Sequence, residues 1–345
     1  MRLTVHIGPP KTGSTSIQLF LRDHADHLRG RGILVPETHH ANMAEMQYAL
    51  RANIPDNRTV QRLGLEAGEN DEETQAELLA TFDEQIAAGR QVGDIDQVVI
   101  TTEGLSKLGR PGVQRLQDWA NQWFDAVEIV FVLRRQDKRA VSLYKNAVKN
   151  AGLEERQVLS HREEMNYADQ VRPWANVFGA EHLHLLLFPD SVDEPRDLLR
   201  DFCALLGCAD MVTDAVSQEY HRNATMDVRA IEVLRLLNKK LPEREFSDVP
   251  AALRLIERKL ANMDIAEVQK PRPSREQAKE FMTAYAESNE EIRATYFPAR
   301  DKLFSDTFDS YPETPHMPGP DVHFLVRLLA DIVEDDEVNA KLTAE

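Results

Sequence analysis

The first half of the chain alternates short apolar runs with segments whose apolar residues recur every three to four positions. The β-branched runs predict strands at residues 3–7, 33–35, 97–101, 127–133 and 182–188. The periodic segments between them predict helices at residues 14–28, 113–124 and 163–178. Continuous apolar strands separated by helices are typical of a parallel sheet that is covered on both faces. We therefore predict an α/β fold with a central parallel sheet flanked by helices.

Residues 41–95 interrupt this alternation, and their pattern predicts a mostly helical insertion. Its clearest part begins at Asp71 and carries acidic residues in its first turn. Apolar residues then recur at helical spacing, at Ala76, Leu79, Phe82 and Ile86. We expect this helix to end before Gly89, because glycine is common just beyond helix ends.

From about residue 225 the pattern is helical. The apolar spacing predicts helices at residues 228–241, 250–263, 274–296 and 321–333. A Pro-rich stretch at residues 311–320 predicts an arm on the surface. We expect one α/β domain over residues 1–310, with the helical insertion at 41–95 and a helical part at 225–300. A C-terminal arm and helix at residues 311–345 follow it.

The segment after the first strand has the composition of a phosphate-binding loop. Gly8 and Pro9 end the strand, and small hydroxyl residues surround Lys11 before the helix begins. Backbone N–H groups in such a turn, the N-terminal end of the helix and a lysine together attract a phosphate group. The residues that we expect to bind it are Pro10, Lys11, Thr12, Gly13, Ser14, Thr15 and Ser16.

The position of the lysine argues against a loop that hydrolyses ATP or GTP. A Walker A loop places its lysine directly after the last glycine. Here Lys11 precedes Gly13, and Ser14 follows that glycine. A P-loop nucleotide or small-molecule kinase, which would need Mg²⁺, therefore fits the sequence less well. A non-catalytic nucleotide-binding protein is a further alternative.

A second candidate phosphate site follows the strand at residues 127–133. Arg134 stands at the end of this strand, and Ser142 follows eight residues later near a helix start. A guanidinium binds phosphate oxygens through two parallel hydrogen bonds, and a helix-borne hydroxyl adds another. The alternative is a solvated basic helix face, because further cations follow, namely Lys138, Arg139, Lys145 and Lys149.

Together and in this order, the two segments resemble sulfotransferases that use 3′-phosphoadenosine 5′-phosphosulfate (PAPS). The loop around Lys11 is similar to the one that binds the 5′-phosphosulfate in this family, and Arg134 and Ser142 match the positions that hold the 3′-phosphate. The family's usual Asn-Pro after the arginine is replaced here by Arg135 and Gln136. The resemblance implies a three-layer P-loop NTPase-like fold, PAPS as donor and no metal.

The resemblance further implies the activity. A sulfuryl group would move from PAPS to a hydroxyl or amine of a carbohydrate, lipid or small-molecule acceptor. Negative charge then develops on the oxygen that bridges sulfur and the departing phosphate, so a fixed cation and N–H donors stabilise the transition state. We expect Lys11 and the amides of residues 12–16 to do this.

The acceptor must lose a proton, and four side chains near predicted strand ends are candidates for the general base. They are Glu37, His39, His40 and Glu103. A histidine is mostly neutral near pH 7 and accepts a proton without special tuning. Each of the four could equally be an ordinary loop residue, and related enzymes use either a histidine or a glutamate. We favour His40, with Glu103 next, and expect His6 in the first strand to be a satisfied core residue.

The composition excludes some partners. The 345 residues carry a formal net charge of −17, so nucleic acid is not expected to bind and a highly sulfated glycan is disfavoured as the acceptor. No apolar run approaches the ~20 residues of a membrane span, and we expect a cytoplasmic protein. Cys203 and Cys208 are expected to be reduced and mostly buried. PAPS, its product PAP and an unidentified acceptor are the expected partners, and the oligomeric state is open.

Overall fold

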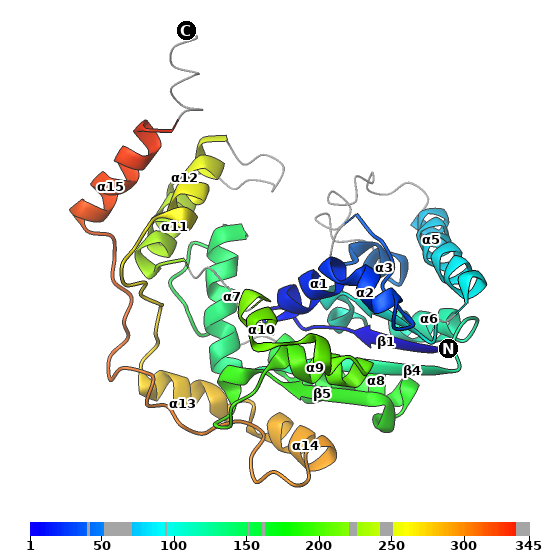
Figure 1. The fold of residues 1–345 in the computed structure, drawn as a ribbon. Coiled ribbons are helices and arrows are strands. Elements are labelled where there is room, and N and C mark those ends of the chain that lie inside the picture. Colours follow the sequence, from blue (N-terminus) through cyan, green and yellow to red (C-terminus); the bar gives the residue numbers. More distant parts are fainter. Residues whose placement is uncertain are drawn as a thin grey trace, which may run out of the picture. The chain divides into compact units, whose positions relative to one another are not determined.

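The computed structural model describes residues 1–39, 42–51, 71–93, 95–150, 152–160, 163–220, 226–241 and 251–335. The chain divides into two compact units, each built from three separate stretches of sequence (Figure 1). The first unit comprises Met1–Arg135, Arg162–Arg222 and Tyr285–Ser305. The second comprises Gln136–His161, Asn223–Ala284 and Asp306–Glu345.

A five-stranded parallel sheet forms the centre of the first unit. Its strands are β1 (Arg2–His6), β2 (Ile33–Leu34), β3 (Gln97–Thr101), β4 (Ala126–Leu133) and β5 (Leu183–Leu187). Their order across the sheet is β2-β3-β1-β4-β5, and every neighbouring pair is parallel. The predicted α/β fold class with a parallel sheet is therefore confirmed. The predicted strands agree with the observed ones to within one residue at either end.

Helices cover this sheet and its ends. The α-helices of the first unit are α1 (Ser14–Asp23), α2 (Ala25–Arg29), α3 (Ala44–Ala49), α5 (Asp71–Val92), α6 (Arg110–Ala120), α8 (Tyr167–Phe178), α9 (Leu198–Leu206), α10 (Asp214–Tyr220) and α14 (Ala286–Tyr296). Short 3-10 turns are η1 (Glu103–Lys107), η2 (Glu163–Met165), η3 (Ala180–His182), η4 (Pro189–Ser191) and η5 (Ala209–Met211). The strand residues Leu3, Val5 and Ile100 are fully buried, so the sheet lies in the core of the unit.

Several predicted helix boundaries differ from the observed ones. The helix expected at residues 14–28 is interrupted at His24, whose ring lies against Phe20 and Tyr220. Helix α5 continues past Gly89 to Val92. A Cβ on Gly89 would lie 3.2 Å from Leu34, so this glycine lets the helix approach β2 closely instead of ending it.

Other differences follow from local capping. The helix expected at residues 163–178 starts at Tyr167, because the Asn166 side chain caps it by accepting from the Asp169 N–H. The helix expected at residues 274–296 is two helices, α13 (Arg275–Thr283) and α14. Within the insertion, α3 and α5 are helical as predicted, whereas residues 52–70 lie outside the described part of the chain.

The second unit is helical. It contains α7 (Gln136–Asn150), α11 (Val228–Lys240), α12 (Ala251–Asn262), α13 and α15 (Val322–Val333). Helices α7, α11, α12 and α15 share an apolar core that includes Tyr144, Val148, Ile231, Leu234, Leu260, Phe324 and Leu328. The predicted arm pairs with the chain ahead of α13, where Arg272 and His316 exchange backbone hydrogen bonds of 3.0 and 2.8 Å.

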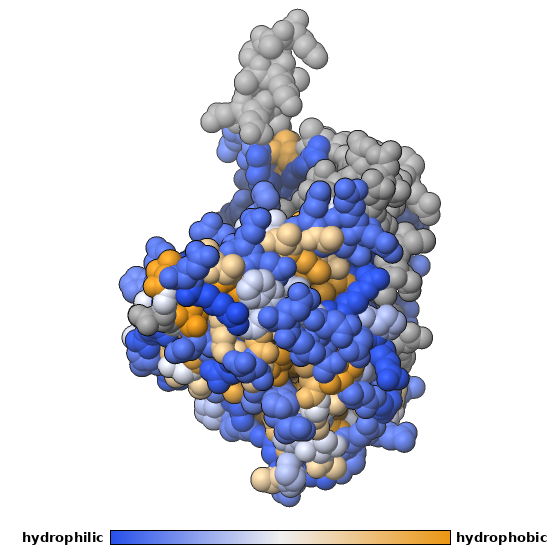
Figure 2. All heavy atoms as spheres, turned by 90° about the vertical axis from the view of Figure 1, so that its right-hand side faces the viewer, coloured by the Kyte–Doolittle hydropathy of each residue, from blue (hydrophilic) through white to orange (hydrophobic). Residues whose placement is uncertain are grey.

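The surface agrees with the acidic, polar composition. Hydrophilic side chains cover much of the face in Figure 2, with apolar side chains scattered between them. Among the described helices, none is long and apolar enough to cross a membrane. Cys203 and Cys208 are both buried and unbridged.

Candidate functional site

The loop between β1 and α1 turns sharply. Gly8, Lys11 and Gly13 all have positive φ angles, of 91°, 69° and 91°. The Thr12 hydroxyl is buried and donates a hydrogen bond of 2.5 Å to the Pro9 carbonyl, which closes the turn. The predicted strand–loop–helix arrangement is therefore present, with positive φ at Lys11 itself and at a glycine on either side of it.

Glycine is required at both ends of this loop. A Cβ on Gly8 would lie 2.7 Å from the Glu103 Cα, and one on Gly13 would lie 2.5 Å from a Leu198 methyl carbon. Both distances are far below van der Waals contact, and both φ angles disfavour a side chain. The glycines thus let the loop lie directly on the neighbouring segments.

The N-terminus of α1 presents donors at this loop. Ser16 N–H makes the first helical bond, to the Gly13 carbonyl at 3.0 Å, so the amides of Ser14 and Thr15 precede the intrahelical ladder. Ser14 is 2% exposed, and its hydroxyl has no hydrogen-bond partner among the described residues. A buried hydroxyl without a partner beside open helix amides fits an anionic ligand.

The hydroxyl groups of the loop differ in their hydrogen-bond partners and in their exposure. Ser16 donates its hydroxyl to the Tyr220 carbonyl at 2.7 Å. Thr12 is turned toward Pro9, whereas Thr15 is exposed. The structure thus leaves Ser14 as the loop hydroxyl that is both buried and unpartnered.

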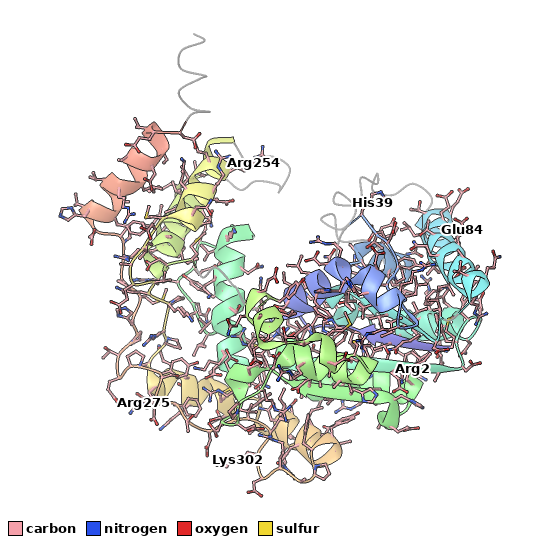
Figure 3. The ribbon with its side chains drawn as sticks, viewed as in Figure 1. Arg2, His39, Glu84, Arg254, Arg275 and Lys302 are labelled. Carbon is pink, nitrogen blue, oxygen red and sulfur yellow. The ribbon has the colours of Figure 1, made fainter. Side chains whose placement is uncertain are left out.

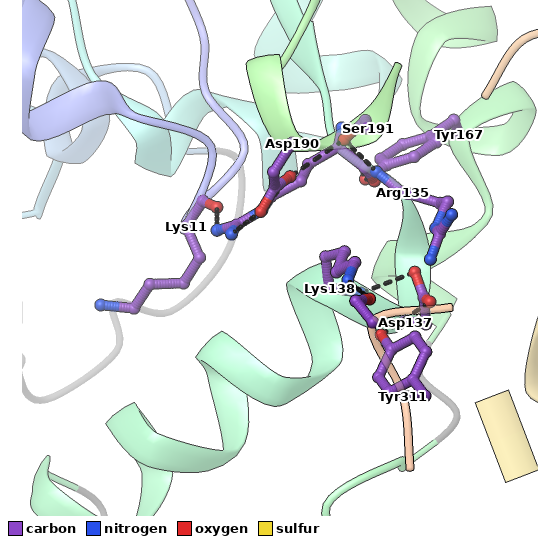
Figure 4. Close-up of polar contacts among 10 residues, drawn as sticks. Lys11, Arg135, Asp137, Lys138, Tyr167, Asp190, Ser191 and Tyr311 are labelled. Carbon is purple, nitrogen blue, oxygen red and sulfur yellow. Dashed lines mark hydrogen bonds and ion pairs between the residues drawn. The ribbon is translucent and has the colours of Figure 1, made fainter. Parts of the chain in front are cut away.

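Arg134 lies against this loop from the end of β4. Its Nη1 donates a hydrogen bond of 2.9 Å to the Lys11 carbonyl, as drawn in Figure 4. The Lys11 side chain extends from the loop away from Asp190 (Figure 4). The structure therefore brings the Arg134 guanidinium to the backbone of the loop, whereas the Lys11 ammonium points elsewhere.

A carboxylate holds the Arg134 guanidinium. Asp190 accepts from Arg134 Nε at 3.1 Å and also accepts from Nη2. The guanidinium lies over the Phe188 ring, 4.3 Å from its centroid, and the Arg134 side chain is 17% exposed. Three N–H groups are engaged, and a guanidinium has further N–H groups for another acceptor.

Glu103 adjoins the loop from the other side. It is the first residue of η1 and is separated from β3 by Thr102, whose N–H extends the sheet by bonding to the His6 carbonyl at 2.9 Å. The close approach of Gly8 to the Glu103 backbone places this residue beside the start of the loop. Glu103 is partly exposed, so its carboxylate is accessible to a ligand.

The candidates after β2 lie farther from the loop. Adjacent strands are about 4.8 Å apart, so the end of β2 is roughly 10 Å from the end of β1. The His39 side chain is 92% exposed (Figure 3), and its Nδ1 lies 3.5 Å from Glu45 Oε1. Glu37 is exposed and is held through its backbone by Gln85. His40 lies outside the described residues.

Ser142 lies on α7, in the second unit, and is partly exposed. The basic residues around it do not form a simple solvated face. Arg139 is fully buried, and the Lys138 ammonium lies 4.5 Å from the Tyr311 ring centroid and 2.9 Å from Ser310 Oγ. Tyr311 donates in turn to Asp137 at 2.7 Å (Figure 4).

His6 lies near the start of the loop, and only one of its two ring nitrogens has a hydrogen-bond partner among the described residues. It is fully buried, and its Nδ1 lies 2.9 Å from the Thr101 hydroxyl. Its Nε2 is buried with no partner among the described residues, which corrects the expectation of a fully satisfied core histidine. Burial lowers the pKa of His6 to about 4, because the charged imidazolium loses its hydration.

The sequence reasoning missed Asp190, Phe188 and Ser191, which follow β5. Ser191 accepts from the Arg135 N–H at 2.8 Å and donates to Asp190 at 3.2 Å, so it holds both residues in place. The sequence pattern could have indicated them, because ligands of parallel sheets bind beyond the C-terminal ends of the strands. The same reasoning singled out Arg134 after β4, and β5 lies next to β4. Among the described residues, no group of three or more His, Cys, Asp or Glu side chains is arranged to hold a metal ion.

Comparison with known proteins gives matches among solved structures. The chain is similar to a structure described as a sulfotransferase from Alicyclobacillus acidocaldarius, at 18% identity and a TM-score of 0.43, over 84% of this chain and 94% of that one. It is also similar to a sulfotransferase domain from the curacin biosynthetic pathway, at 11% identity and a TM-score of 0.34, over 82% and 96%. No protein-family model and no curated protein matches the sequence.

Proposed function

We propose that this protein is a sulfotransferase that uses PAPS as donor and transfers its sulfuryl group to a hydroxyl or amine of an acceptor. The observation that carries the proposal is the loop between β1 and α1. Lys11 precedes the helix there, and the Ser14 hydroxyl is buried beside open helix amides without a partner. This donor set suits a phosphosulfate and lacks the lysine position of an ATP-hydrolysing loop.

The two phosphate groups of the donor would be bound at neighbouring strand ends. The 5′-phosphosulfate accepts from the amides of Ser14 and Thr15 and from the Ser14 hydroxyl. The 3′-phosphate accepts from the remaining N–H groups of Arg134. The contacts of Arg134 with Lys11 and Asp190 support this arrangement, because they hold the guanidinium beside the loop.

The reaction would be an in-line transfer. The acceptor oxygen or nitrogen forms a bond to sulfur while the bond between sulfur and the bridging oxygen breaks, and the electron pair stays on the 5′-phosphate of PAP. The Lys11 ammonium stabilises the charge that builds on that oxygen. The acceptor proton passes to a general base, and the products are the sulfated acceptor and PAP.

We assign the general base to Glu103 in preference to the histidines after β2. Glu103 follows the strand next to β1 and lies against Gly8, whereas His39 is two strands away and almost fully exposed. A base must come within hydrogen-bond reach of the proton that it removes. His40, the residue favoured by the sequence pattern, lies outside the described residues and is the alternative base.

A titration followed by thermal unfolding tests the donor. PAP, ATP and GTP are added separately, each with and without Mg²⁺. We expect PAP to raise the unfolding temperature without Mg²⁺, since a ligand of the folded state stabilises it. Stabilisation by ATP only with Mg²⁺ would point to the kinase alternative instead. If none of the three stabilises the protein, the loop does not bind a nucleotide and the proposal is wrong.

A further inference from the structure

A cavity of about 690 Å³ opens beside the edge strand of the first unit. It lies among the segment after β2 and helices α2, α3 and α5, and all of its lining residues belong to this unit. This volume falls within the usual range for sites that bind small molecules. The residues that decide its chemistry are Asp26, Arg29, Glu37, His39, Glu45 and Leu78.

Glu45 is the unusual residue of this cavity. It is 5% exposed, although it carries a carboxylate. Its Oε1 accepts from the His39 N–H at 2.9 Å, but its Oε2 is buried and has no partner among the described residues. A buried carboxylate oxygen without a donor is strongly unfavourable, and a donor on a ligand would remove that cost.

The charges around the cavity favour a cation. Among the described residues that line it, three carry carboxylates, Asp26, Glu37 and Glu45, and one carries a guanidinium, Arg29. His39 adds a positive charge only when it is protonated. The remaining lining is largely apolar and includes Leu34, Val35, Leu78 and Ala88. An ammonium group on an apolar body matches both features, whereas an anion would meet an excess of like charge.

Helix α3 connects this cavity to the loop. Glu45 and Gln47 lie on the same short helix, and the Gln47 side chain packs directly on the Gly104 backbone, where an added Cβ would lie 1.8 Å from Gln47 Oε1. Gly104 follows Glu103, which lies against Gly8. The cavity and the phosphate loop are therefore joined through packed segments of one unit.

We propose that this cavity holds the acceptor and selects one that carries an ammonium group on an apolar chain, with Glu45 as the residue that recognises the ammonium. The role of the bound molecule as acceptor rests on the proposed sulfotransferase function. The binding of an amine at Glu45 is a separate claim that needs no PAPS.

Three alcohols of matched length test the proposal: 6-amino-1-hexanol, 1-hexanol and 6-hydroxyhexanoate. Binding is followed by thermal unfolding without nucleotide, and turnover is followed with PAPS. We expect only the amino alcohol to stabilise the protein, and its kcat/KM to exceed that of 1-hexanol by about tenfold or more, the effect of one charge-assisted hydrogen bond. In Glu45→Gln this preference falls to about one.

Glu84→Gln is the matched control, because Glu84 is an exposed carboxylate on α5 outside the cavity (Figure 3). We expect it to keep the preference for the amino alcohol. Equal responses to all three alcohols, or a preference that survives Glu45→Gln, would overturn the proposal even if PAPS is the donor. Glu45-dependent binding of the amine with no turnover and no binding of PAP would instead refute the sulfotransferase function and leave an amine site.

Discussion

The Arg134 guanidinium donates a hydrogen bond of 2.9 Å from Nη1 to the carbonyl oxygen of Lys11. This contact joins the end of β4 to the loop between β1 and α1. Lys11 has a φ of 69°, a conformation that a residue with a side chain adopts at a cost unless its surroundings hold it. Arg134 donates to this carbonyl, and Asp190 accepts from Arg134. Hydrogen bonds therefore link the residues that follow three strands, β1, β4 and β5.

Loss of the Arg134 side chain is expected to weaken PAP binding. Arg134→Ala removes both the proposed phosphate ligand and the hydrogen bond to the Lys11 carbonyl. We expect a loss of affinity of about tenfold or more, as for a charge-assisted hydrogen bond, measured by isothermal titration calorimetry. Arg22→Ala, at an exposed arginine of α1, serves as control and should bind PAP like the wild type. Unchanged affinity in Arg134→Ala would remove this residue from the nucleotide site.

The pair of Arg134 and Asp190 is expected to stabilise the fold as a unit. The guanidinium and carboxylate make two hydrogen bonds at a partly buried site. A double-mutant cycle with Arg134→Lys and Asp190→Asn should give a coupling free energy of about 1 kcal/mol, measured by urea unfolding. Additive effects of the two substitutions would mean that the contact does not contribute to stability.

Replacement of Lys11 is expected to slow the chemical step. Lys11→Ala removes the cation that we propose stabilises the departing phosphate oxygen, so kcat should fall by ~10²-fold or more. Affinity for PAP should change less, because the amides of α1 remain. Lys11→Arg keeps the charge and should recover part of the activity. Steady-state kinetics with PAPS check this, and near-normal turnover in Lys11→Ala would exclude Lys11 from the mechanism.

Replacement of Glu103 is expected to remove the general base. Glu103→Gln keeps the size of the side chain, so PAP binding should be unchanged while kcat falls by ~10²–10⁴-fold. His39→Asn provides the comparison, because it changes an exposed candidate two strands away. If His39→Asn lowers kcat more than Glu103→Gln, the base lies after β2.

His6 is expected to make the fold sensitive to acid. Burial lowers its folded pKa from 6.5 to about 4, so between these values the unfolded chain binds a proton that the folded chain does not. The stability is therefore fully present above pH 6.5 and falls as the pH drops toward 4. The difference of about 2.5 pKa units corresponds to roughly 3 kcal/mol.

Urea unfolding of His6→Gln between pH 7 and pH 4 measures this contribution. The variant lacks the titrating group, so its free energy of unfolding should fall less steeply with pH than that of the wild type. The exposed His27→Gln is the control and should keep the wild-type slope. Parallel slopes in His6→Gln and the wild type would show that His6 does not govern the acid response.

Much of the fold could be predicted because its signals are local. The five strands are continuous apolar runs, and their positions follow from a short window of sequence. The helix breaks at His24 and before Tyr285 carry no glycine or proline signal. Gly89 wrongly predicted a helix end, because this glycine lets α5 approach Leu34. That contact joins segments distant in sequence.

The sequence by itself determined that a loop around Lys11 joins a short strand to a helix, and that an arginine directly follows a second core strand. Apolar periodicity, glycine and proline act within a few residues, so they report such units directly. Only the tertiary structure decided which side chains meet there. The strand order places Glu103 and Arg134 on either side of the loop, His39 farther away and Asp190 on the guanidinium, because these contacts depend on how segments distant in sequence pair in the sheet.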